Sequence, residues 1–340
     1  MDIFSLILVV VGFAFIIFIH ELGHFILSKI MGFKVEEFAV GFGKPLLSKK
    51  FGETLYSIRA IPLGGYNKLP EVDSSYVKEP MSLKYYLKRF SVLVAGGLFN
   101  IISAYIVIIM TVAFLGVPTS SPVIKEVSPE TSQYAQLFKP QDEILSINGE
   151  KVTSGDFLKG LENTSLDIVV KRDDEEVLIH IEKEEKNQPV GIIMASVIQK
   201  PPVEEIIPMS NQAFFKAIGL IFTSFDILSK MPADDMVKNV AGPVGISQMM
   251  YQAQIEMGLV GFLTLFAIIS INIGIMNLLP IPLMDGGRIL VDTIQFASRN
   301  IIPEKGIQYI EYSGLLCIGL LFFLGMMGDF YRLVLVKLPN

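Results

Sequence analysis

The chain has 340 residues, of which 51% are hydrophobic and only 18% are charged. Soluble domains usually carry about 25% charged residues, so this composition excludes an ordinary soluble protein and predicts a polytopic α-helical membrane protein. The net charge of −6 argues against a nucleic-acid partner. The single cysteine, Cys317, excludes a disulfide framework.

Four apolar segments are long enough to cross a bilayer, which takes about 20 mostly apolar residues. They run from Ile3 to Leu27, from Ser91 to Val117, from Leu259 to Leu279 and from Gly314 to Val336. A further apolar segment, Ala213 to Met231, contains Lys216 and Asp226. We interpret this segment as an amphipathic helix at the membrane surface, which leaves four transmembrane helices.

The region between the second and third segments is polar and opens with the turn-rich sequence from Pro118 to Pro122. Residues Ser165 to Arg172 and Glu176 to Glu182 alternate between apolar and polar side chains, which is typical of strands. The sequence from Asp142 to Val152 contains an Asn-Gly turn between two further strand segments. We therefore predict a β-rich domain inserted between two membrane halves.

The loop between the first and second spans, Ser28 to Phe90, contains eleven lysines and arginines. The positive-inside rule places this loop in the cytoplasm and the inserted domain outside. We predict four parts: a first membrane half at 1–117, the inserted domain at 118–200, a surface helix and linker at 201–258, and a second membrane half at 259–340.

The sequence HELGH, from His20 to His24, lies within the first apolar segment. Residues four apart share one helix face, so both imidazoles can bind one zinc ion. Glu21 is rotated about 100° from His20 and can serve as the general base toward a zinc-bound water. Ionisable groups inside a membrane helix cost about 3 kcal/mol each, so a functional role is favoured over a structural one.

A catalytic zinc usually has three protein ligands. His180, the remaining histidine, lies in the polar β-rich region, so a carboxylate is expected to complete the set. The candidates on the cytoplasmic side are Glu36, Glu37, Asp285 and Asp292. Asp285 is the best placed, because it follows the third span after two prolines and precedes two glycines. If the segment from Ala213 to Met231 crossed the membrane, Asp285 would lie on the opposite side from His20.

The chain resembles the site-2 protease family over nearly its whole length, in particular the regulator-of-sigma-E protease branch of bacteria. The motifs that carry the resemblance are HELGH, NLLPIPLMDGG ending at Gly287, GGLFN ending at Asn100, RAIPLGGY from Arg59 to Tyr66, and GPVGIS from Gly242 to Ser247. The mid-chain domain resembles a PDZ module, although Gln141 stands where glycine is common.

The resemblance implies a zinc metalloendopeptidase of the bacterial inner membrane that acts on membrane-spanning proteins or peptides within the lipid bilayer. It implies His20, His24 and Asp285 as zinc ligands, with Glu21 as the catalytic residue. It further implies that Asn100, Asn277 and the loop residues Gly64, Gly65 and Tyr66 contact substrate. Expected substrates are anti-sigma factors already cut outside the membrane, or remnant signal peptides. The sequence does not indicate an oligomeric state.

Two other functions are compatible with parts of the pattern. A zinc transporter would explain buried His and Asp ligands, but it explains Glu21 and the inserted domain poorly. A PDZ-type adaptor would not need an intact HExxH motif.

Residues Gly96, Gly97 and Asn100 could also form a helix-packing patch of small residues rather than part of an active site.

Overall fold

The computed structural model describes residues 3–74, 79–152, 157–232 and 240–332. It consists of two compact units, one formed by Met1–Thr111 with Glu204–Asn340 and the other by Val112–Val203.

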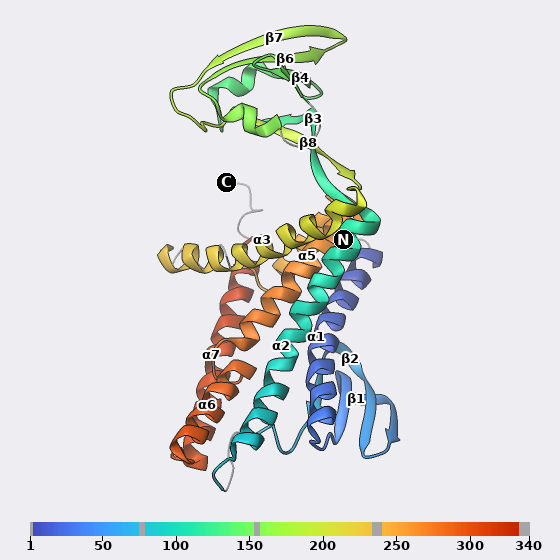
Figure 1. The fold of residues 1–340 in the computed structure, drawn as a ribbon, viewed down its shortest axis with the longest axis vertical. Helices are drawn as coiled ribbons and strands as arrows, with labels where there is room; N and C mark the ends of the chain where they lie inside the picture. The colour runs from blue at the N-terminus through green and yellow to red at the C-terminus, as the bar shows by residue number, and fades with distance from the viewer. Residues whose placement is uncertain (1–2, 75–78, 153–156, 233–239, 333–340) are drawn as a thin grey trace. The chain divides into compact units, whose positions relative to one another are not determined.

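The first unit is a helical bundle with a β-hairpin (Figure 1). Its helices are α1 (Ile3–Met31), α2 (Leu83–Met110), α3 (Val203–Lys230), α5 (Pro243–Leu278), α6 (Asp285–Ser298) and α7 (Glu304–Phe330). Among the described residues, five of these helices, all except α6, are long and apolar enough to cross a membrane. The chain is therefore built as a multi-pass membrane protein.

Helix α5 is interrupted at Gly258, whose φ of 59° is incompatible with a continuous helix. The predicted third span, beginning at Leu259, corresponds to the part after this break. Helix α7 begins at Glu304, well before the predicted start of the fourth span at Gly314. The early turns of α7 contain Lys305 and Glu311, which lower the mean hydropathy there, so this part of the helix is not recognised as part of an apolar span.

Helices α2 and α5 approach closely through two glycines. A Cβ atom on Gly97 would lie 2.7 Å from the carbonyl oxygen of Gly274, and a Cβ on Gly274 would lie 2.7 Å from that of Gly97. Small residues of this kind allow the backbones of membrane helices to touch. Helix α1 packs against α5 through a buried cluster that includes Val9, Ile16 and Phe266. These contacts fix α1, α2 and α5 against one another.

Helix α3 lies across the direction of α1, α2, α5 and α7 in Figure 1. It buries Ser210, Ala217 and Ile221, whereas Phe215 and Phe222 are exposed. An amphipathic helix in this orientation agrees with the interpretation of α3 as a surface helix, although its length and composition would also allow a span. The number of four spans stays a prediction.

The β-hairpin consists of the long antiparallel strands β1 (Glu37–Phe51) and β2 (Thr54–Lys68). It extends well beyond the loop Arg59 to Tyr66 that the sequence indicated. The strands reverse tightly at Gly52, whose φ of 58° suits glycine. The hairpin contacts α1 through Phe38, whose ring lies 5.0 Å from that of Phe25.

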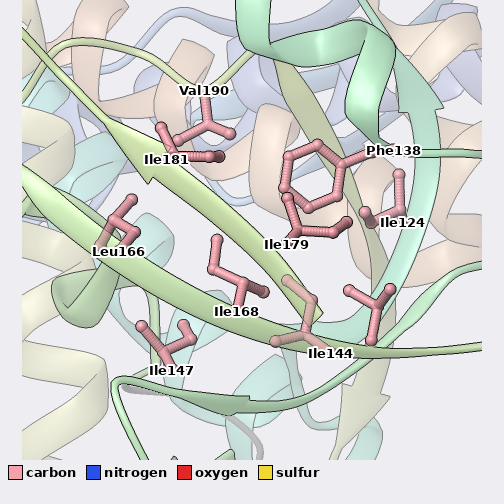
Figure 2. Close-up of a cluster of buried hydrophobic side chains, with 10 residues drawn as sticks. Ile124, Phe138, Ile144, Ile147, Leu166, Ile168, Ile179, Ile181 and Val190 are labelled. Atoms are coloured by element: carbon pink, nitrogen blue, oxygen red, sulfur yellow. The ribbon is translucent and has the colours of Figure 1, made fainter. Parts of the chain in front are cut away.

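The second unit is an antiparallel sheet with the strand order β7-β6-β4-β3-β8. The strands are β3 (Val117–Val127), β4 (Glu143–Ile147), β5 (Glu150–Lys151), β6 (Ser165–Arg172), β7 (Glu175–Glu182) and β8 (Ile192–Gln199), with short helical turns at Thr111–Leu115, Gln133–Leu137 and Phe157–Glu162. Figure 2 shows its apolar core, formed by Ile124, Phe138, Ile144, Ile147, Leu166, Ile168, Val170, Ile179, Ile181 and Val190.

The strand predictions for this unit are confirmed. Strand β6 has the predicted limits, and the Asn148-Gly149 turn joins β4 to β5 with φ values of 52° and 82°. Gln141 has a φ of 74°, which explains why glycine is favoured at this position. The assignment of this unit as a PDZ module, and the four predicted domain limits, stay predictions.

Candidate metal centre

Three potential ligand atoms converge between α1 and the start of α6. Nε2 of His20 and Nε2 of His24 each lie 3.2 Å from Oδ2 of Asp285, and the two Nε2 atoms lie 3.2 Å from each other. Among the described residues, these three form the single group of His, Cys, Asp or Glu side chains that could hold a metal ion. The side chains of His20 and Asp285 are only 12% exposed.

The donor set fits zinc. With bonds of about 2.0–2.1 Å and tetrahedral angles, the ligand atoms of zinc lie about 3.3 Å apart. All three separations agree with this value. The nearest polar neighbours of the buried Oδ2 of Asp285 are the Nε2 atoms of His20 and His24, and the meeting of three ligand atoms in a buried position is costly unless a cation binds between them. The residues present therefore suit a three-ligand zinc site.

Helix α2 orients one of the imidazoles. Nδ1 of His24 lies 2.8 Å from the carbonyl oxygen of Val92, to which it can donate its proton. This contact selects the tautomer in which Nε2 carries a free lone pair, as metal-binding histidines require. His24 is therefore held by a second element besides its own helix.

The turn before α6 positions the carboxylate. Helix α5 ends at Leu278, and the two prolines at 280 and 282 prevent it from continuing. Side chains at Gly286 and Gly287 would overlap the carbonyl groups of Leu278 and Ile281, so only glycine permits this tight return. Asp285 is the first residue of α6, a helix that the sequence analysis did not predict.

Glu21 lies in the same cavity of about 290 Å³ as the three candidate ligands. Its Oε2 accepts a hydrogen bond of 2.8 Å from Nδ2 of Asn67, which also donates to the Glu21 carbonyl oxygen at 2.6 Å. Asn67 follows directly after the predicted substrate loop and was not identified from the sequence. Since it lies 46 residues from Glu21, no local pattern indicates the contact.

The predicted substrate-contacting residues occupy different positions. Tyr66 and Asn277 line the cavity. Gly64 does not line the cavity and lies against the ring of Phe42, whereas a Cβ on Gly65 would lie 3.3 Å from Cγ of Glu21. Asn100 is completely buried and does not line the cavity, and its side-chain atoms have no hydrogen-bond partner among the described residues. Its role near the substrate stays a prediction.

The other three candidate carboxylates have different partners. Glu36 pairs with Lys34 and Lys68, Glu37 with Arg59, and Asp292 with Arg89. His180 lies on β7, is exposed, and contacts Asp167 at 2.6 Å. None of them belongs to the convergent set.

Apolar helices around a convergent His-His-Asp set with an adjacent glutamate define a membrane-embedded zinc metalloprotease. The model of peptidase family M50, the site-2 protease family, matches residues 8–321, and the chain belongs to this family. Bacterial relatives named "Putative zinc metalloprotease" include those of Campylobacter jejuni (31% identical over 94% of this chain and 92% of the relative), Clostridium perfringens (33%, 93% and 96%) and Helicobacter pylori (31%, 96% and 99%). The protein is thus a zinc metalloprotease.

Proposed function

We propose that the protein hydrolyses peptide bonds within or near transmembrane segments of membrane proteins, using a zinc ion held by His20, His24 and Asp285. The observation that carries this proposal is the mutual separation of 3.2 Å between the three ligand atoms, in a cavity that also contains Glu21. When bound, zinc polarises the scissile carbonyl and lowers the pKa of the attacking water.

Glu21 acts as the general base in this proposal. Its carboxylate takes a proton from the attacking water and later gives one to the leaving amine. The hydrogen bond from Asn67 to Oε2 supports this role, because it restricts the orientation of the carboxylate. A base must be held within hydrogen-bond reach of the water for the proton to move.

The substrate needs to expose its backbone before it can be cut. A transmembrane helix hides its amide groups in internal hydrogen bonds, so it has to unwind locally. Strand β2 at Gly64 to Tyr66 would hold the unwound segment by strand addition, and the Asn277 side chain would hydrogen-bond to it. The positions of Tyr66 and Asn277 in the cavity wall support this arrangement.

The proposed topology has four spans, with α3 at the membrane surface. The eleven basic residues between Ser28 and Phe90 favour a cytoplasmic position for the hairpin and the catalytic centre. The inserted PDZ-like domain then lies outside the cytoplasm. By analogy with the regulator-of-sigma-E branch, the substrates would be single-span anti-sigma factors trimmed outside the bacterial inner membrane, or remnant signal peptides.

The variant E21Q tests the chemistry, because it keeps the side-chain shape and removes the base. Purified E21Q should bind zinc as the wild type does and should cut a membrane-spanning peptide about 10²- to 10⁴-fold more slowly. Wild-type protein that moves zinc across vesicles but cuts no such peptide would favour a transporter. Substantial proteolysis by E21Q would exclude Glu21 as the base.

A further inference from the structure

A buried ion pair joins α2 to α6, away from the candidate ligands. Nε of Arg89 donates to Oδ2 of Asp292 at 2.8 Å, and Nη2 donates to Oδ1 at 3.1 Å. The Arg89 side chain is 0% exposed and that of Asp292 is 1% exposed. The two-point geometry of a guanidinium and a carboxylate restricts both distance and orientation.

The same guanidinium also fixes the chain segment that follows β2. It donates hydrogen bonds to the backbone carbonyl of Glu71, to that of Ser74 at 3.0 Å and to that of Val72 at 3.4 Å. Val72 and its neighbour Asp73 line the catalytic cavity. Arg89 therefore ties together two helices and one wall of the cavity.

Both helices of this ion pair also carry part of the candidate metal centre. Asp292 lies seven residues after Asp285, so the two carboxylates share one face of α6 about two turns apart. On α2, Arg89 lies one turn before Val92, whose carbonyl oxygen contacts Nδ1 of His24. The ion pair thus links the helix that orients His24 to the helix that supplies Asp285.

The connection between α5 and α6 is irregular, so the position of α6 depends on its contacts with other elements, which also include a hydrogen bond of 2.9 Å between Tyr86 of α2 and Thr293. The chain between α5 and α6 contains Pro280 and Pro282, and Leu283 has a φ of 73°. At the far end of α6, Gln295 exchanges hydrogen bonds with the backbone of Ile302, which joins α6 only to the following loop. Within the described residues, the ion pair with Arg89 is the one salt bridge between α6 and another helix beyond the metal centre.

We propose that Arg89 and Asp292 form a positioning pair that sets the location of Asp285 relative to the two imidazoles. The proposal rests on the proposed function, since it takes Asp285 as a zinc ligand. Neither residue touches the reacting atoms. Loss of the pair is expected to lower zinc affinity and turnover together, because the third ligand is no longer held at the separation that zinc requires.

The double variant R89M/D292L provides the main test. Removal of one partner alone would leave a buried charge, which is strongly destabilising, whereas apolar replacement of a whole buried pair is often nearly neutral. We expect the folded double variant to bind zinc at least about tenfold more weakly, as on loss of other supporting contacts around a metal site. Chelator competition measures the affinity, and cleavage of a membrane-spanning peptide measures kcat.

The chain offers a matched control in the second unit. Arg172 donates to both carboxylate oxygens of Asp142 at 2.9 and 2.6 Å, and Asp142 is 1% exposed. The variant R172M/D142L removes a similar pair and should leave zinc affinity unchanged. The variant R89K keeps the opposite charges and removes the two-point geometry, so it repeats the test if R89M/D292L does not fold, and a loss of zinc affinity in the same direction is expected.

Three outcomes separate the hypotheses. Weaker zinc binding in R89M/D292L, with unchanged binding in R172M/D142L, supports the positioning pair. Wild-type zinc affinity and kcat in a folded R89M/D292L or R89K, while D285A loses zinc, overturn the positioning role alone. Retention of zinc by D285A instead overturns the proposed ligand set, and the positioning role with it.

Discussion

Gly96 of α2 lies directly against the imidazole of His24. A Cβ atom at this position would overlap Nε2 of His24 and would lie 2.7 Å from Cε1 of both His20 and His24. A real Cβ atom essentially never lies closer than 3.0 Å to such a neighbouring heavy atom. The absence of a side chain at position 96 therefore provides the space in which the two imidazoles meet Asp285.

This relationship predicts that G96A loses zinc. The added methyl group would displace both imidazoles, so we expect a decrease in zinc affinity of at least about tenfold. Metal analysis after dialysis against a weak chelator measures the loss. G319A is the control, because a Cβ on Gly319 of α7 would have no described heavy atom within 4 Å. Equal zinc affinity in G96A and the wild type would contradict the close contact.

Removal of a ligand should abolish zinc binding more completely. We expect about one zinc per chain in the wild type. H20A, H24A and D285A should lose most of this zinc, because a catalytic zinc usually has only about three protein ligands. H180A is the control, since this exposed histidine contacts Asp167 on a different unit. Elemental analysis of the purified variants gives the ratio. Unchanged zinc in D285A would identify another residue as the third ligand.

The sequence predicts those parts of the site that depend on local spacing. His20 and His24 share a helix face by their separation alone, and the prolines and glycines around Asp285 favour it as the third ligand. The strand limits of β6 followed from alternation between buried and exposed side chains. In each case the determining contacts lie within one element, so the pattern is visible without the fold.

The missing parts depend on contacts between distant segments. Asn67 reaches Glu21 from a strand of the hairpin, and Arg89 reaches Asp292 from a helix 203 residues away. The start of helix α6 is not evident from the sequence because Asp285-Gly286-Gly287 is a typical turn sequence, and its close packing against the end of α5 is a contact of the folded chain. Sequence patterns carry no direct record of such tertiary contacts.

Asn67 provides a test of how Glu21, the proposed base, is held. N67D keeps the shape but replaces the donor beside Glu21 by an acceptor with a negative charge. We expect kcat to fall by at least about tenfold with little change in KM or zinc content. The reason is that the hydrogen bond from Asn67 to Glu21 is expected to stabilise the transition state and not to bind the substrate. N67A should show a smaller loss, since it removes the donor without adding repulsion. A raised KM with unchanged kcat would instead assign Asn67 to substrate binding.

The hairpin beside the catalytic cavity contains an ionised cluster that predicts a dependence on pH. Oε1 of Glu37 accepts hydrogen bonds of 2.7 Å from both Ser57 and Arg59, and Oε2 accepts one of 2.8 Å from Tyr66. Burial opposes ionisation of Glu37, but these hydrogen bonds outweigh it and lower the pKa of its carboxyl group below the ordinary value of 4.5. Glu37 is therefore charged at neutral pH and stabilises the hairpin there.

Because the pKa of Glu37 is lower in the folded state than in the unfolded state, its contribution is complete above pH 4.5. That contribution decreases as the pH falls toward and through the folded-state pKa. At pH 7, E37Q should therefore show faster amide hydrogen exchange in β2 than the wild type, with slower peptide cleavage because Tyr66 loses its carboxylate acceptor. The difference in hairpin stability between the two proteins, obtained from exchange rates corrected for pH, should shrink toward pH 3. A difference that is equally large at both pH values would show that the charge of Glu37 does not hold the hairpin.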